Sequence, residues 1–77
     1  MVGVVLTMKP MQKYGFIKGE DGKEYFFHKD DLRNVNWNQM EFDFSRGFEK
    51  IHVEFEPTEA EKGKRAKDVM RLNGEGE

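Results

Sequence analysis

Two short aromatic stretches within Tyr14 to His28, YGFIKGEDGKEYFFH, decide how this chain of 77 residues folds. The Asp-Gly pair at positions 21–22 lies between them and suits the positive φ of a tight hairpin turn. Side chains alternate between the two faces of a strand, so Tyr14 and Phe16 share one face of the first strand. Phe26 and His28 share one face of the second. The segment predicts an antiparallel hairpin with four rings on one surface.

Three further segments have strand patterns. Residues 2–9 are apolar and β-branched, and Pro10 ends them. Residues 51–56 alternate apolar and polar residues up to Pro57, which is expected to end that strand. Residues 66–72 read as a fifth strand, although their pattern also suits a short helix.

The other segments read as connections. Residues 30–32 suit one helical turn, and the polar stretch 33–46 is predicted to be a loop. Residues 59–64 read as an exposed connection. The tail 73–77 has nothing to bury and is expected to be disordered, which leaves one domain over residues 1–72.

Five short strands with glycine-rich turns favour a closed barrel, because closure removes the sheet edges that a chain of this size cannot cover. We therefore predict an all-β fold, a five-stranded antiparallel OB-fold (oligonucleotide-binding) barrel. Gly15 is expected to have a structural role, permitting close packing between the rings that flank it on a sharply coiled strand. The predicted core consists of the side chains that alternate with the outward rings and their counterparts on other strands: Val5, Ile17, Tyr25, Phe27, Val53 and Phe55.

Composition narrows the class of protein. The chain has no cysteine, which excludes disulfides and thiolate metal sites and suits a reducing cytoplasm. Its longest apolar start, residues 4–6, is too short for a signal sequence or a membrane span, so we expect a soluble, cytoplasmic protein with no membrane partner. A core this small cannot surround a deep cavity, and we expect neither a small-molecule substrate nor a cofactor.

Positive charge gathers around the aromatic hairpin. Residues 1–29 carry five lysines and three acidic residues, a net charge of +2, whereas residues 30–63 carry four basic and nine acidic residues, a net charge of −5. A local basic patch attracts phosphates while an acidic remainder limits non-specific binding. Lys9, Lys13 and Lys29 are the candidate phosphate contacts, although any one of them also reads as ordinary solvated surface.

Exposed rings among lysines favour a surface on which unpaired bases stack. The candidates are Tyr14, Phe16, Phe26 and His28, joined by Trp37 from a polar segment, where an exposed tryptophan indicates function or an interface. Structural interpretations stay open for some of them. Phe16 and Phe26 could instead be covered by the 33–46 loop, and His28 could be a hydrogen-bonded structural histidine.

The order and spacing of these motifs resemble the cold-shock domain family. In that family, Lys-Gly-Phe-Gly-Phe-Ile on the second strand and Val-Phe-Val-His on the third carry the nucleic-acid surface; here they stand as residues 12–17 and 25–28. The resemblance runs from Gly3 to about Val69. It implies an OB-fold and single-stranded nucleic-acid binding, and it implies stacking roles for the matching residues Tyr14, Phe16, Phe26, His28 and Trp37.

The chain departs from the family pattern at a few of these positions. Leu6-Thr7-Met8 replaces the usual Lys-Trp-Phe at the end of the first strand, so one lysine and one stacking ring are missing. Lys29 stands where the family often has an aromatic residue, and Lys13 stands at the family's glycine. We expect Lys13 and Lys29 to offset the missing ring by attracting phosphates, in a divergent member of the family.

Catalysis is not expected. Ser45 is the only serine and lies far in sequence from both histidines, so no nucleophile is paired with a base. With two histidines and no cysteine, a metal site is not predicted either.

The sequence leaves two functions open. The first is a sequence-tolerant binder of single-stranded RNA or DNA that acts as an RNA chaperone by keeping strands unpaired. The second is an OB-fold protein-interaction module with weakened nucleic-acid binding. A monomer is favoured. RNA and DNA cannot be distinguished, because no motif encodes contacts to the 2′-OH.

Overall fold

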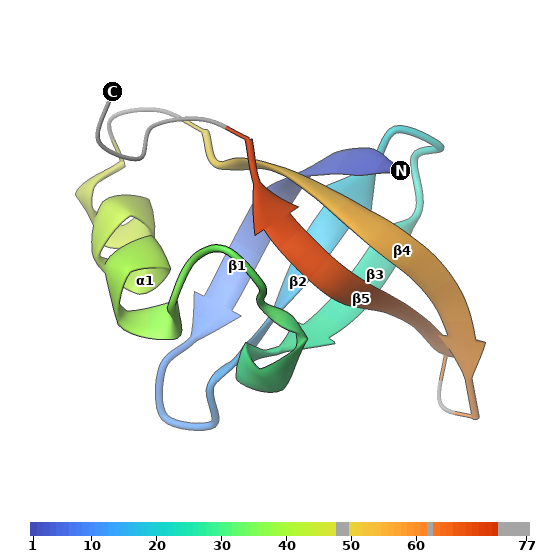
Figure 1. Ribbon diagram of the computed structural model, residues 1–77, viewed down its shortest axis with the longest axis horizontal. Helices are drawn as coiled ribbons and strands as arrows, with labels where there is room; N and C mark the ends of the chain where they lie inside the picture. Colours follow the sequence, from blue (N-terminus) through green and yellow to red (C-terminus); the bar gives the residue numbers. More distant parts are fainter. Residues whose placement is uncertain (48–49, 62, 73–77) are drawn as a thin grey trace.

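The computed structural model describes residues 1–47, 50–61 and 63–72. Five strands close into a barrel in the order β1-β2-β3-β5-β4, which confirms the predicted all-β OB-type barrel (Figure 1). The strands are β1 (Val2–Lys9), β2 (Tyr14–Gly19), β3 (Glu24–His28), β4 (His52–Ala60) and β5 (Gly63–Arg71).

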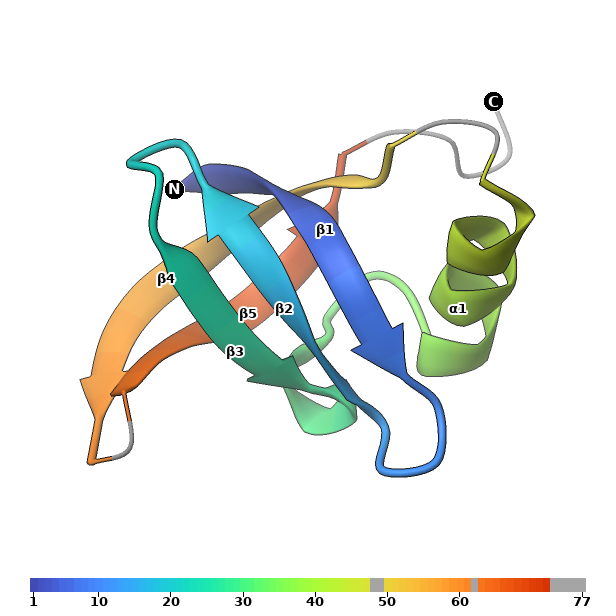
Figure 2. The same ribbon diagram turned by 180° about the vertical axis from the view of Figure 1, so that it is seen from behind.

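One pair of neighbouring strands is parallel, a feature that the sequence pattern does not indicate. β3 and β5 pair in parallel with Phe26 opposite Arg65, while the other neighbouring strands are antiparallel. Seen from behind, β5 passes behind the β1–β2–β3 sheet, and its pairing with β3 helps to close the barrel (Figure 2). This closure brings a residue from the end of the chain next to the aromatic hairpin.

The predicted β2–β3 hairpin is confirmed. Tyr14 pairs with His28 and Phe16 pairs with Phe26, so the outward rings lie side by side across the two strands. Gly22 takes a φ of 83°, which L-residues rarely adopt.

Asp21 stabilises the hairpin turn. Its carboxylate accepts hydrogen bonds from the Lys23 backbone N–H (3.0 Å) and the Tyr25 hydroxyl (2.7 Å). These two bonds lower the pKa of Asp21, and the bond from the hydroxyl raises the pKa of Tyr25. The turn is therefore held by an ionised carboxylate at neutral pH.

β1 contains an irregularity that matters for the outer surface. The register of β1 against β2 shifts between Val5 and Thr7, which places Thr7 opposite Phe16. The strands approach closely at Gly15: a Cβ there would meet the Thr7 carbonyl oxygen and lie 2.8 Å from Cε1 of Phe27. Gly15 therefore has a structural role, as predicted, but the close neighbours are the Thr7 backbone and the core ring of Phe27 rather than the flanking rings.

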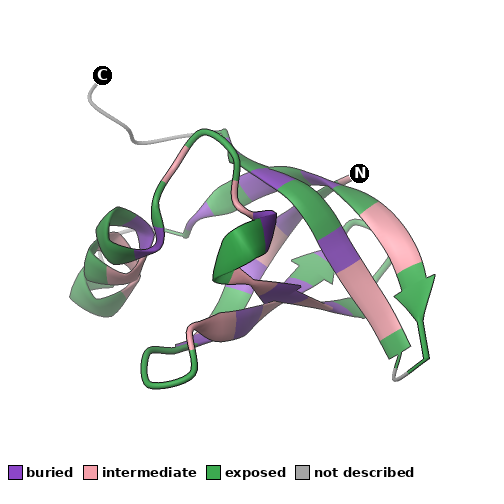
Figure 3. Ribbon diagram, turned by 60° about the horizontal axis from the view of Figure 1, so that its bottom comes forward, coloured by how far each residue is buried: buried purple, intermediate pink, exposed green. Residues whose placement is uncertain are grey.

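The barrel interior is apolar, and buried and exposed residues alternate along the strands (Figure 3). All six predicted core side chains are buried. The buried hydrophobic residues are Val5, Met8, Ile17, Tyr25, Phe27, Trp37, Met40, Ile51, Val53, Phe55, Ala66 and Val69.

The prediction of a loop over residues 33–46 is wrong for most of its length. Residues Trp37–Arg46 form the helix α1, which lies beside β1 in both ribbon views (Figures 1 and 2). Asn36 caps its first turn by accepting a hydrogen bond from the Gln39 backbone N–H (2.7 Å), and Gly47 ends it with a left-handed φ of 70°.

The end of β4 and the start of β5 also differ from the prediction. β4 continues through Pro57 to Ala60, so the expected exposed connection over 59–64 is instead a tight hairpin in which Ala60 pairs with Gly63. Proline is tolerated there because β4 pairs with β1 only up to Glu54, leaving β5 as its neighbour at Pro57.

The fifth strand and the helical turn are confirmed, as β5 and as the short 3-10 helix η1 (Lys29–Asp31). The tail 73–77 lies outside the described residues.

Candidate nucleic-acid interface

Three half-buried rings pack against one another on the outer face of β2 and β3. Tyr14, Phe16 and Phe26, together called the platform below, have ring centroids 5.4–6.1 Å apart. The planes of Tyr14 and Phe26 differ by 31°, but Phe16 stands nearly edge-on to both, at 88° and 74°. These three of the four predicted rings therefore share one surface, but their planes are not parallel. Edge-to-face contacts stabilise such ring pairs.

His28 extends this face but has a structural bond of its own. It lies opposite Tyr14 on β3, and its side chain is 33% exposed. Its Nδ1 accepts a hydrogen bond from the Asp30 backbone N–H (3.2 Å), which fixes the ring at the start of η1. This bond supports a structural role for His28. The exposed third of the side chain stays accessible to a base.

The three candidate lysines lie at one end of the platform, where β1 and β3 end and β2 begins. The Lys13 N–H donates to the Lys9 carbonyl (2.8 Å), and the Lys29 N–H donates to the Lys13 carbonyl (3.0 Å). Lys9 also pairs with Tyr14 in the sheet. Backbone bonds thus gather three lysines that are twenty residues apart in sequence. Asp30 partly offsets this charge, with its carboxylate 3.4 Å from the Lys29 ammonium.

A row of outward residues crosses four strands through the platform. Thr7 on β1 pairs with Phe16, Phe16 with Phe26, and Phe26 with Arg65 on β5. The Arg65 guanidinium carbon lies 5.6 Å from the Phe26 ring centroid, a cation–π arrangement. The row therefore begins with a small hydroxyl side chain and ends with a planar cation.

This barrel with its outward rings agrees with a sequence comparison. A family model described as the 'Cold-shock' DNA-binding domain matches residues 1–72 of the 77. The chain belongs to the cold-shock domain family. Membership implies binding of single-stranded nucleic acid. No curated protein matches the chain in a sequence search.

Trp37 is a correction to the predicted site. In this cold-shock domain, Trp37 begins α1 and is 5% exposed, with its ring centroid 6.0 Å from that of Phe27 inside the barrel. The predicted exposed loop position is wrong, because α1 turns Trp37 and Met40 inward to cover apolar side chains. Its Nε1 has no hydrogen-bond partner among the described residues. The buried ring offers no face to a base.

The resemblance matches Lys13 to a glycine of the family motif, and the backbone conformation of Lys13 is one that suits glycine. Its φ is 62°, in the left-handed region. The backbone conformation therefore matches a glycine, and the lysine side chain adds a charge at the cost of backbone strain.

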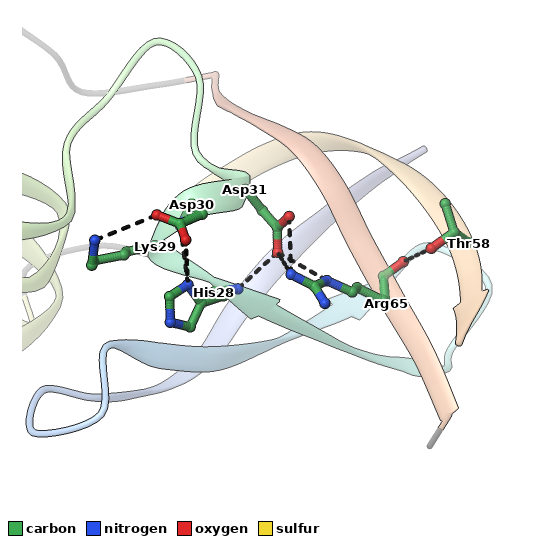
Figure 4. A network of polar contacts seen from close by, with 6 residues as sticks. All are labelled: His28, Lys29, Asp30, Asp31, Thr58 and Arg65. Carbon is green, nitrogen blue, oxygen red and sulfur yellow. Dashed lines mark hydrogen bonds and ion pairs between the residues drawn. The ribbon is translucent and has the colours of Figure 1, made fainter. Parts of the chain in front are cut away.

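Sequence reasoning missed Arg65, whose position is fixed by a polar network (Figure 4). Asp31, which is 6% exposed, accepts from Nε (3.2 Å) and Nη2 (3.4 Å) of Arg65. The same carboxylate accepts from the His28 N–H (2.9 Å), and the Arg65 carbonyl accepts from the Thr58 hydroxyl (3.3 Å). Nothing in the sequence signals this pair, since its members are 34 residues apart.

A groove of about 630 Å³ lies beside the platform, between β2–β3 and the β4–β5 hairpin. Phe16, Phe26 and Arg65 line it together with the exposed carboxylates Glu24 and Glu61. Lys64 also lines it, but its ammonium is 2.6 Å from Glu59. That hydrogen bond raises the pKa of Lys64 and lowers the pKa of Glu59.

No helix within residues 1–47, 50–61 and 63–72 is long and apolar enough to cross a membrane. In the same residues, no group of three or more His, Cys, Asp or Glu side chains is arranged to hold a metal ion.

Proposed function

We propose that this protein binds single-stranded RNA or DNA by stacking unpaired bases on Tyr14, Phe16, Phe26 and His28, while lysines attract the phosphates. The observation that carries the proposal is the ring cluster on the outer face of β2 and β3. Half-buried rings fixed by one another lose little conformational freedom on binding, so stacking contributes about 1–3 kcal/mol per base.

The lysine end of the platform supplies attraction to the backbone. Lys9, Lys13 and Lys29 are joined through their backbones around one end of the rings. Each phosphate contact with a single strand adds about 0.7 to the slope of log affinity against log salt. Binding is therefore expected to weaken steeply with salt.

Such binding also supports an RNA chaperone function. The rings can contact only unstacked bases, so unpaired strands are bound and duplexes are not. Binding then shifts the equilibrium of a weak hairpin toward its open form by mass action. No chemical step is needed, and the protein is proposed to act without a cofactor.

The test compares oligonucleotide affinity in ring variants by fluorescence anisotropy of a labelled heptauridine and a matched duplex. Phe16→Leu and Phe26→Leu keep apolar packing but remove the ring, and each is expected to lose about five- to 150-fold in affinity. Phe42→Leu is the matched control, because Phe42 is 55% exposed on α1 and outside the platform. Trp37, the only tryptophan, is buried and so reports folding in every variant.

Equal affinity of all three variants for the single strand would refute the platform. The alternative, a protein-interaction module, has one supporting observation. Val2, Leu6 and Leu72 are 40–50% exposed and line a second groove of about 600 Å³ beside β1. A salt-insensitive protein complex with no oligonucleotide binding would favour that alternative.

A further inference from the structure

We infer that the groove beside Phe26 is a guanine site, in which Arg65 reads the base by a bidentate hydrogen bond. This inference rests on the proposed function and refines it, because stacking on the platform alone carries little base preference. The site adds a residue from β5 to a surface otherwise built from β1, β2 and β3.

The guanidinium of Arg65 lies close to the Phe26 ring. Arg65 lies 5.6 Å from the Phe26 ring centroid and lines the groove with Phe16 and Phe26. A base that enters the groove can therefore stack on a ring and lie within reach of the guanidinium. The side chain is 34% exposed, so it is accessible from the groove without rearrangement.

Asp31 occupies only part of the hydrogen-bonding capacity of Arg65. Asp31 accepts from Nε and Nη2, which occupies the side edge of the guanidinium. An arginine has five N–H donors, so the end edge formed by Nη1 and Nη2 keeps a pair of parallel N–H groups. No other hydrogen bond joins the Arg65 side chain to the described residues. Asp31 thus holds the side edge and leaves the end edge without a partner among the described residues.

A bidentate arginine needs a base with two adjacent hydrogen-bond acceptors. Guanine presents O6 and N7 side by side, and this is the commonest partner of a bidentate arginine. Adenine places a donor beside N7, and uracil and thymine have no adjacent acceptor pair. Cytosine offers N3 and O2 but a smaller ring to stack, so it ranks second.

The negative charge of the groove lining favours a base over a phosphate. Glu24 and Glu61 line the same groove and are exposed, and they repel a phosphate. They also accept hydrogen bonds, which guanine can donate from N1 and N2. The groove therefore suits a base rather than the sugar–phosphate backbone, which is left to the lysine end.

The test measures anisotropy of heptathymidines that carry one central guanine, cytosine, adenine or deazaguanine, in which carbon replaces N7. The wild type is expected to bind the guanine strand about five- to tenfold more tightly than the deazaguanine and all-thymine strands. Arg65→Lys keeps a charge for Asp31 but has no fork, and it is expected to bind guanine and deazaguanine strands equally. Arg33→Lys, at an exposed pair with Asp68, is expected to keep the full preference.

The outcomes separate this inference from the proposed function. Two outcomes overturn the guanine site alone. One is tight binding of heptathymidine with no higher affinity for the strand that carries guanine. The other is equal affinity for the guanine and deazaguanine strands, both above that for heptathymidine. A preference that persists in folded Arg65→Lys also overturns it. No binding of any strand by the wild type overturns both proposals. If Arg65→Lys fails to fold, the deazaguanine comparison on the wild type still decides.

Discussion

Replacing Lys13 by glycine should make this protein more stable and a weaker binder. Lys13 has a φ of 62° in the turn between β1 and β2, a conformation that suits glycine. Both backbone bonds at this residue, to Lys9 and from Lys29, involve main-chain atoms and persist in a glycine variant. The substitution therefore removes strain and one positive charge while leaving the turn intact.

The expected gain in the free energy of unfolding is the difference between two opposing effects, the strain removed from the folded state and the flexibility added to the unfolded chain. A left-handed conformation costs an L-residue about 1–2 kcal/mol, which glycine avoids. Glycine is more flexible in the unfolded chain, which returns about 0.5–1 kcal/mol. The net stabilisation of Lys13→Gly is about 0.5–1 kcal/mol, or a rise in Tm of about 2–8 °C for a domain of this size.

Thermal and urea unfolding, followed by Trp37 fluorescence, measure the stability. Lys13→Ala is the matched control, since alanine loses the charge but keeps the Cβ, and it should show no gain. Both variants should lose one phosphate contact, lowering the slope of log affinity against log salt by about 0.7. A glycine variant no more stable than the alanine variant would refute the left-handed turn, and an unchanged salt slope in both would exclude Lys13 from the interface.

Two further predictions test the row and the helix. Thr7→Trp places a ring opposite Phe16 and should raise single-strand affinity about five- to 150-fold in the anisotropy assay, whereas Thr7→Val should not; equal affinities would show that the row does not continue onto β1. The hydrogen bond from buried Arg71 lowers the pKa of Asp43, so this pair stabilises the fold above the ordinary carboxyl pKa of about 4 and is lost as pH falls through the lowered value. Asp43→Asn should therefore unfold more easily in urea at pH 7, with the difference from wild type shrinking below about pH 4; a constant difference would contradict the linkage.

The aromatic hairpin could be predicted because its signals are local. Strand alternation fixed the outward position of Phe16 and Phe26, and Asp21-Gly22 has the turn chemistry that the structure confirms. Each of these inferences needs only a few neighbouring residues. The inward position of Phe27 followed from the same alternation.

The helix α1 has sequence signals of its own, although it was predicted as a loop. Asn36 and Gly47 mark the two ends of α1, and Trp37, Met40 and Phe44 share the spacing of one helical face. Polar residues between them masked that pattern and favoured a loop. Once the helix forms, tertiary packing decides that the tryptophan is inside.

Arg65 is a residue of the candidate site that no local sequence pattern could reveal. Its place beside Phe26 depends on the parallel β3–β5 pair, and its orientation depends on Asp31. Both relations join residues more than thirty positions apart. Chain closure, rather than propensity, creates this end of the surface.

Local backbone contacts explain how a chain with a formal charge of −2 can attract nucleic acid. The backbone bonds from Lys13 to Lys9 and from Lys29 to Lys13 gather positive charge at one end of the platform. The acidic residues Glu54 and Glu56 are exposed on β4, which neighbours neither β2 nor β3 in the barrel. Exposed charges further apart than about 8 Å are largely screened at physiological salt. A bound strand therefore responds to the local lysines more than to the net charge, so adding acidic residues to β4 should matter less than removing a single lysine from the platform's end.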